Sequence, residues 1–163
     1  MKRLLILSGK GGTGKTTTAA AFIQFSQSRA IADCDVDAPN LHIVTEKTGE
    51  CRTKEFIGSK KAVIDETLCV HCGNCAEKCR FNAISDKGMS YGVDEYHCEG
   101  CGVCQYVCPN DAVRLVEDVA GKQELYLGDT VFSTATLKMS RGNSGKLVTA
   151  VKLDMLKLSL IHI

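Results

Sequence analysis

Most of the chain's ten cysteines lie between residues 69 and 108, and their spacing restricts the fold more than any other feature. Two runs repeat the pattern C-x₂-C-x₂-C-x₃-C. Three cysteines two residues apart allow one loop to bind three irons of a cube, whereas the fourth lies too far along the chain and reaches a second cube. The spacing therefore predicts two [4Fe-4S] clusters, one bound by Cys69, Cys72, Cys75 and Cys108, the other by Cys98, Cys101, Cys104 and Cys79.

The cysteine region is also an internal repeat. The two runs end alike, in Cys-Arg-Phe-Asn-Ala-Ile and Cys-Pro-Asn-Asp-Ala-Val, which predicts two similar units related by a pseudo-two-fold axis. Residues 61–117 resemble the bacterial two-cluster ferredoxins. One departure is Arg80, which stands where a proline usually follows the fourth cysteine. We expect Arg80 to change the surroundings of one cluster without removing a ligand.

Closely spaced cysteines can also form a zinc ribbon or disulfides. A zinc ribbon would use Cys69 and Cys72 with Cys98 and Cys101, but it leaves four regularly spaced cysteines without a role. Disulfides are typical of oxidising compartments. The N-terminal apolar run of four residues is too short for a signal peptide and has no small-residue cleavage site, so a cytoplasmic location is expected.

Charge and hydropathy exclude several partners. The net charge is +1 with no long like-charge run, so neither a nucleic acid nor a membrane surface is expected as a partner. No apolar stretch approaches the length of a transmembrane helix. His71 and His97 adjoin cysteines of the two runs, and we expect both to be hydrogen-bonded or exposed rather than ligands. Cys34 and Cys51 lie outside the pattern and are expected to have no role in a cluster.

A second motif lies near the N-terminus. Residues 3–8 read as a buried strand, 9–14 as a glycine-rich turn, 15–27 as a helix and 30–32 as a second strand. The turn fits G-x₄-G-K-[ST], which predicts a phosphate loop for ATP, with Lys15 on the β- and γ-phosphates and the Thr16 hydroxyl on Mg²⁺. The residues of this predicted site are Gly9, Lys10, Gly11, Gly12, Thr13, Gly14, Lys15, Thr16 and Thr17. The alternative is a glycine-rich turn without a ligand.

The run Lys-Gly-Gly-Thr-Gly-Lys-Thr-Thr resembles the deviant Walker motif of the MinD/ParA ATPases. This resemblance implies an ATP-dependent homodimer, in which Lys10 crosses to the partner's nucleotide. It also implies that Asp35 positions the attacking water and that Asp33 lies near Mg²⁺. Lys10, Lys15 and Asp35 are then the expected catalytic residues. The alternative for the two aspartates is a solvated acidic turn.

The order of motifs resembles one branch of that superfamily, in which a ferredoxin domain is inserted into the ATPase. The implied fold is an α/β P-loop domain with an incomplete parallel sheet, interrupted by a ferredoxin-like α+β insert. The expected domains are 1–60 and 118–155 for the P-loop part and 61–117 for the insert, with 156–163 a non-native tail. Later family motifs, among them Asp-x-Pro-Pro-Gly, are missing, so the chain is expected to be an inactive fragment of an ATPase. A hairpin over 123–137 and a helix over 144–158 are also predicted.

Three functions follow from these patterns. The first is an ATPase that couples nucleotide state to electron transfer through the two clusters. The second is an ATPase that assembles or carries iron–sulfur clusters. The third is a plain electron-carrier ferredoxin with a non-functional P-loop. The sequence does not identify the redox partner protein.

Overall fold

The computed structural model describes residues 3–159 and separates into two compact units. The first, here called the sheet unit, comprises Met1–Glu55, Lys122–Leu137 and Ser144–Ile163. The second, the cysteine unit, comprises Phe56–Gly121 and Lys138–Asn143. The chain therefore leaves the sheet unit, forms the cysteine unit and returns, and each unit is described by itself.

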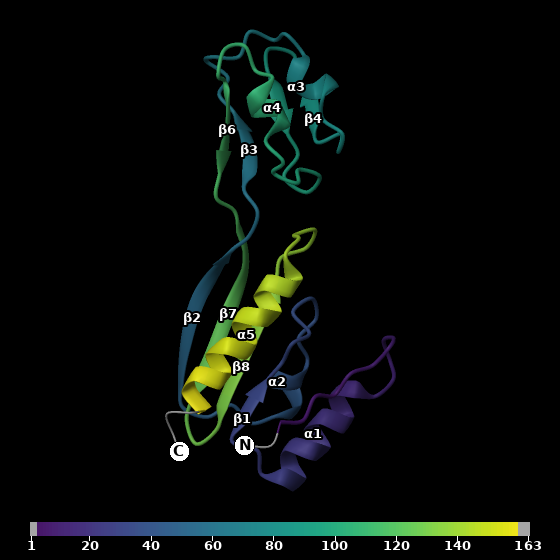
Figure 1. Ribbon diagram of the computed structural model, residues 1–163, viewed down its shortest axis with the longest axis vertical. Helices are drawn as coiled ribbons and strands as arrows, with labels where there is room; N and C mark the ends of the chain where they lie inside the picture. The colour runs from purple at the N-terminus through teal and green to yellow at the C-terminus, as the bar shows by residue number, and fades with distance from the viewer. Residues whose placement is uncertain (1–2, 160–163) are drawn as a thin grey trace. The chain divides into compact units, whose positions relative to one another are not determined.

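The sheet unit is built on four strands in the order β1-β8-β7-β2 (Figure 1). Their bounds are Ala30–Ala32 for β1, Glu50–Ile57 for β2, Val119–Leu127 for β7 and Val131–Leu137 for β8. β1 and β8 are parallel, with Ile31 opposite Phe132. The predicted hairpin is confirmed, because β7 and β8 are neighbours joined by a short turn, although β7 begins before residue 123.

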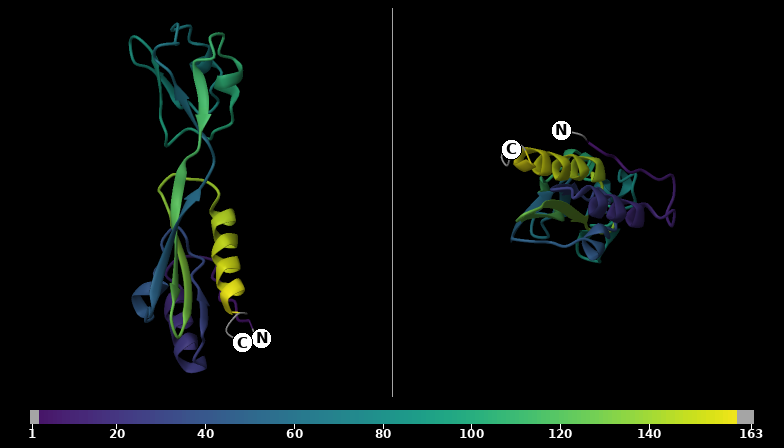
Figure 2. Two further views of the ribbon diagram at one scale, coloured as in Figure 1. Left: turned by 90° about the vertical axis from the view of Figure 1, so that its left-hand side faces the viewer. Right: turned by 90° about the horizontal axis from the view of Figure 1, so that it is seen from below.

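Three helices accompany this sheet: α1 (Lys15–Ser26), α2 (Leu41–Val44) and α5 (Ser144–Ser159). α5 packs along β8 and β1, and its Leu147 and Val151 are fully buried (Figures 1 and 2). A second core cluster joins Ile31, Leu41 and Phe132, with α1 packed against it. Most of β8 is buried, as expected for a strand covered on both faces.

The predicted P-loop fold is wrong. Residues 3–8 form no strand, and Leu4, Leu5 and Leu7 are 67%, 65% and 78% exposed. A short apolar run does not by itself distinguish a buried strand from other structures, because a strand also needs a neighbour to pair with. β1 and β8 form a parallel pair, and a β7–β8 hairpin occupies the middle of the sheet. The described chain is therefore not a doubly wound parallel sheet.

The cysteine unit shows the internal repeat. Its first half is β3 (Lys61–Ile64), α3 (Asn74–Glu77) and β4 (Ile84–Asp86), and its second half is β5 (Tyr91–Val93), α4 (Val103–Tyr106) and β6 (Val113–Val116). β3 pairs antiparallel with β6, and β4 with β5, so each sheet joins one strand from each half. Equivalent backbone bonds of 2.7 Å run from Asp65 to Ala112 and from Asp94 to Ala83. The two halves are thus interlocked.

The predicted tail falls at the end of α5. Residues 156–159 are the last residues of that helix, and 160–163 lie outside the described residues. No described helix is both long and apolar enough to span a bilayer.

Candidate metal centres

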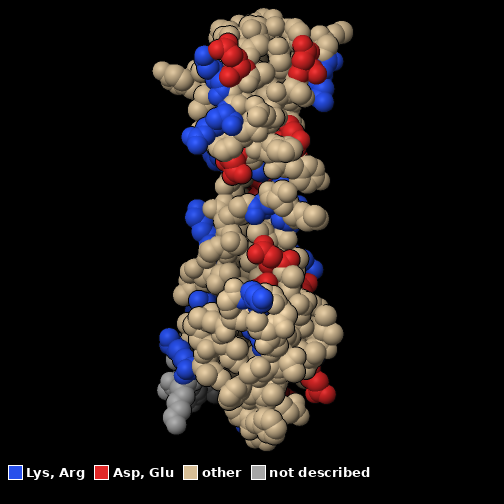
Figure 3. Space-filling model, turned by 90° about the vertical axis from the view of Figure 1, so that its right-hand side faces the viewer, with Lys and Arg blue, Asp and Glu red and all other residues tan. Residues whose placement is uncertain are grey.

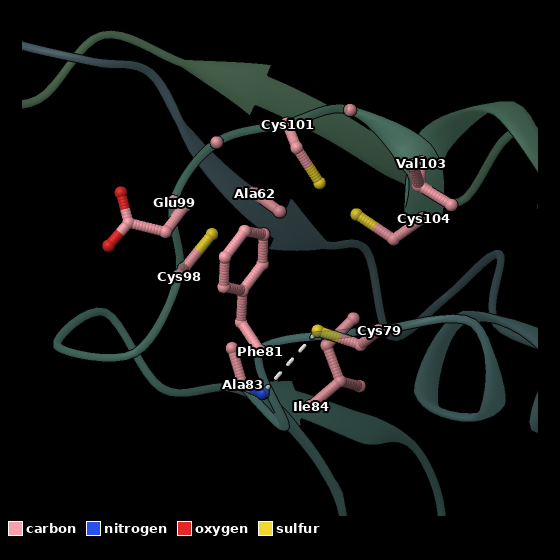
Figure 4. A pocket seen from close by; sticks show the side chains of 12 residues that line it. Ala62, Cys79, Phe81, Ala83, Ile84, Cys98, Glu99, Cys101, Val103 and Cys104 are labelled. Atoms are coloured by element: carbon pink, nitrogen blue, oxygen red, sulfur yellow. Dashed lines mark hydrogen bonds between the residues drawn. The ribbon is translucent and has the colours of Figure 1, made fainter.

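Two hollows in the cysteine unit are each lined by four cysteines. The first, which is partly open to solvent, is lined by Cys98, Cys101, Cys104 and Cys79 (Figure 4). The second is lined by Cys69, Cys72, Cys75 and Cys108. We call them the Cys98 hollow and the Cys69 hollow. The structure thus brings together three cysteines of one run with the fourth of the other, in the two sets that the spacing predicts.

The loop backbone explains how three cysteines face one point. Gly73 and Gly102 precede the short helices α3 and α4 with φ of 81° and 82°, a left-handed conformation that glycine adopts without steric cost. Two residues earlier, His71 and Gly100 also have positive φ, 55° and 66°. At Gly100 a Cβ would lie 1.8 Å from the Lys60 carbonyl oxygen, so a side chain has no room there.

The cysteines of the two hollows differ in their exposure to solvent. Cys75, Cys98 and Cys104 are buried, whereas Cys72 and Cys101 are exposed. Burial raises the pKa of the Cys75 and Cys104 thiols, because desolvation disfavours a thiolate in an apolar pocket. A bound metal reverses this preference, since thiolate is the form that coordinates.

The last cysteine of each run is held by the backbone. The Ala83 N–H donates to Cys79 Sγ at 3.4 Å, and the Ala112 N–H donates to Cys108 Sγ at 3.3 Å. Hydrogen bonds to ligand sulfurs are among the factors that set the potential of an iron–sulfur cluster. The repeat therefore supplies the same donor to both hollows.

The donor sets fit [4Fe-4S] clusters and argue against the zinc ribbon. A ribbon needs Cys69 and Cys72 to meet Cys98 and Cys101, but the two pairs line different hollows. A single zinc ion is bound by four thiolates, each at about 2.3 Å from the metal. Within residues 3–159, no three His, Cys, Asp or Glu side chains lie close enough together to bind one metal ion. Four cysteines around a hollow with mostly apolar walls are instead the donor set of a cluster.

Several neighbours of the hollows were not predicted from the sequence. Tyr91 lines the Cys69 hollow, and burial raises the pKa of its hydroxyl. The His71 ring stacks on Tyr91 at 4.9 Å and its Nε2 lies 3.0 Å from an Asp86 oxygen, so His71 is hydrogen-bonded as expected. Lys61 is buried and donates from its ammonium to the Cys98 carbonyl oxygen. An alignment of the two halves shows Lys61 as a charged residue whose equivalent in the other half is the neutral Ser90, and this difference could have drawn attention to Lys61.

The predicted phosphate site has a different arrangement. Residues 9–14 form an exposed turn, and Lys15 forms an ion pair with Asp35 at 3.0 Å. Asp33 is buried and accepts hydrogen bonds from the backbone N–H groups of Asp35 and Leu41. Asp33 therefore holds the turn before α2. ATP at this turn and Mg²⁺ at Thr16 stay predictions from the sequence.

The fold and the two hollows define a class, that of proteins with two clusters held by interlocked cysteine runs. Comparison with known proteins agrees, because residues 62–115 match the family model described as a 4Fe-4S dicluster domain. An uncharacterized ferredoxin of Methanocaldococcus jannaschii is 30% identical over 119 residues, which are 72% of this chain and 75% of the relative. The pyruvate synthase subunit PorD of that organism is 32% identical over 76 residues, 46% of this chain and 81% of the subunit. The chain therefore belongs to the 4Fe-4S dicluster ferredoxins.

Another relative covers more of the chain. An uncharacterized protein of M. jannaschii is 32% identical over 155 residues, which are 92% of this chain and 53% of that protein. The chain thus spans about half the length of this relative. The similarity includes the sheet unit, whose role the relative's name does not describe.

These findings overturn the assignment to the MinD/ParA ATPases. The matching family is a cluster-binding domain, the named relatives are ferredoxins and PorD, and residues 3–8 do not form the strand that a P-loop requires. The roles of Lys10, Lys15 and Asp35 and the homodimer were implied by that resemblance, and they stay predictions from the sequence. Of the three functions predicted from the sequence, the plain electron carrier is the one supported.

Proposed function

We propose that the cysteine unit carries single electrons between partner proteins through two [4Fe-4S] clusters with crossed ligation. The observation that supports this proposal is the gathering of four cysteines, three from one run and one from the other, around each hollow. Cys69, Cys72, Cys75 and Cys108 would hold one cluster, and Cys98, Cys101, Cys104 and Cys79 the other. A bound cluster accepts and returns one electron at a time.

The protein's own residues bind, orient and shield the two groups. The runs supply the thiolates, and the Ala83 and Ala112 amides hold the crossing cysteines. Apolar side chains such as Ile84 and Val113 are buried beside the hollows and exclude water from them. Cys72 and Cys101 are exposed, so we propose that a redox partner approaches the loops that carry them.

The nature of that partner is a further part of the proposal. On the face shown in Figure 3, basic and acidic side chains are interspersed, and neither sign forms a large continuous area. Electron-transfer encounters are typically small and short-lived. We therefore propose a weakly bound protein partner whose docking depends little on ionic strength.

A titration at controlled potential tests the electron carrier. The full chain is reconstituted anaerobically with iron and sulfide and reduced stepwise, and its visible absorbance is followed. The proposal predicts reversible uptake of two electrons per chain. The Cys51→Ser variant is the matched control, since Cys51 is exposed and lies outside both sets, and it should behave as the wild type. Absorbance that does not respond reversibly to potential would contradict the proposal.

A further inference from the structure

The two hollows differ by one buried cation. Lys61 opens strand β3, is only 8% exposed, and donates from its ammonium to the main-chain carbonyl of Cys98. The next residue, Ala62, lines the Cys98 hollow. Within residues 3–159, no carboxylate forms an ion pair with Lys61. A buried charge without a counter-ion is costly, which points to an anion in the neighbouring hollow.

The repeat provides an internal comparison. Lys61 and Ser90 stand at the same distance before the first cysteine of their runs, and Ser90 is also buried, at 5% exposure. Because the halves are interlocked, Lys61 of the first half reaches the loop of the second. The neutral Ser90 is its counterpart, so the Cys69 hollow has no lysine at the equivalent position.

A second cation favours the same hollow. Arg80 follows Cys79, the crossing cysteine of the Cys98 hollow, and its guanidinium lies 5.2 Å from the centre of the Phe81 ring. Phe81 lines that hollow. The equivalent residue of the other half is the neutral Pro109. Lys61 and Arg80 thus have neutral counterparts in the other half and lie beside the Cys98 hollow, but Arg80 is exposed and only Lys61 is buried.

Acidic neighbours do not cancel this difference. Glu99 also lines the Cys98 hollow, but it is exposed, and its carboxylate points away from the four sulfurs (Figure 4). Water screens an exposed charge far more than a buried one. Beside the Cys69 hollow, the His71 ring stacks on Tyr91 and is hydrogen-bonded to the carboxylate of Asp86. Arg80 and Asp86 are exposed and screened in the same way, so the difference in local charge between the two hollows rests on the buried Lys61.

We propose that Lys61 makes the two clusters unequal, so that the cluster bound by Cys98, Cys101, Cys104 and Cys79 is reduced first. This inference rests on the proposed function. A cluster gains one negative charge when a one-electron donor such as dithionite reduces it, and no bond forms or breaks in the protein. A fixed ammonium nearby stabilises the more negative state, most strongly where the surroundings are apolar. Lys61 acts through the field it creates and is a positioning residue.

The test compares Lys61→Gln with Lys60→Gln. The first variant keeps an N–H donor for the Cys98 carbonyl and removes only the charge. The second removes the same charge from an exposed neighbour. We expect Lys61→Gln to make reduction of one cluster about tenfold less favourable, equivalent to 59 mV for one electron, and to leave the other unchanged. Lys60→Gln should change neither, and Lys61→Arg should restore the wild-type potential.

A measurement on the wild type removes any dependence on the folding of a variant. In half-reduced protein, the paramagnetically shifted NMR signals of Cys101 and Cys104 should show the larger share of the added electron, compared with those of Cys72 and Cys75. An equal share, or unchanged potentials in a fully loaded Lys61→Gln variant, would overturn the inference and leave the electron carrier intact. Failure of the wild type to bind iron would instead overturn the proposed function.

Discussion

Replacing Gly100 by alanine tests whether the backbone of the second cysteine loop is as tightly constrained as the structure indicates. The added Cβ would lie 1.8 Å from the Lys60 carbonyl oxygen and 2.8 Å from its carbon, well inside any contact distance. A left-handed alanine costs about 1–2 kcal/mol, and the shift needed to relieve the overlap adds about 1–3 kcal/mol. We therefore expect the loop to be destabilised by about 2–5 kcal/mol in total.

Gly88→Ala is the matched control for this variant. Gly88 also has a positive φ, of 95°, but no atom lies within 4 Å of the place that an added Cβ would take, so only the conformational cost applies. His71 shows independently that the equivalent position of the first loop accepts a side chain at a φ of 55°. The overlap with Lys60 is thus what distinguishes Gly100.

The assay is the rate at which visible absorbance is lost in a fixed concentration of guanidinium, because cluster release is irreversible and its measure is kinetic. Each 1.4 kcal/mol of native-state strain released in the transition state is about a factor of ten in rate. Since the overlap accounts for about 1–3 kcal/mol, Gly100→Ala should bleach about 5- to 100-fold faster than Gly88→Ala. Equal rates for the two variants would refute the reasoning, because they would mean that the Lys60 carbonyl does not restrict this loop.

Three further predictions concern other sites. Cys108→Ser should remove the cluster of the Cys69 hollow, seen as a loss of the NMR signals of Cys69, Cys72 and Cys75. Cys79→Ser should remove the cluster of the Cys98 hollow, seen as a loss of the signals of Cys98, Cys101 and Cys104. Loss of signals from the same run as the substituted cysteine would exclude crossed ligation. Arg141→Met should destabilise the cysteine unit by about 3 kcal/mol in urea, because the Arg141 side chain is 5% exposed and its Nε lies 2.7 Å from Asp118; an unchanged midpoint would contradict this. Burial raises the pKa of the Tyr126 hydroxyl to about 12, and the nearby Cys51 thiol and a carboxylate act in the same direction. The stabilisation of the folded state by neutral Tyr126 is therefore fully present below about pH 10. It is lost as the pH rises through about 12. The difference in tyrosinate absorbance between the wild type and Tyr126→Phe should therefore appear at about pH 12. Ionisation of Tyr126 at about pH 10, the ordinary tyrosine value, would contradict this prediction.

The cysteine spacing carried most of what the sequence revealed about the site. Ligand spacing is a local code, so the composition of both sets of four could be predicted without knowledge of the surrounding fold. The repeat and its pseudo-symmetry followed from matching segments such as those after Cys79 and Cys108. The surroundings of each hollow could not be predicted in the same way. Lys61 reaches Cys98 only because β3 pairs with β6, a contact between residues far apart in the chain.

The phosphate-loop interpretation failed for a related reason. A glycine-rich motif indicates a nucleotide site only when a strand precedes it and a helix follows. The helix beginning at Lys15 is present, but residues 3–8 have no strand to pair with in the described chain. In the described chain Lys15 forms an ion pair with Asp35, and Asp33 accepts two backbone hydrogen bonds. The catalytic roles that the motif alone would assign to Lys15 and Asp35 stay predictions.

The electron-carrier function depends most on the cysteine unit holding two four-iron clusters. Anaerobic reconstitution followed by iron, acid-labile sulfide and zinc analysis measures this directly. We predict about eight irons and about eight sulfides per chain, and no bound zinc. Protein that binds zinc without sulfide, or that holds only about four irons, would contradict the two-cluster centre.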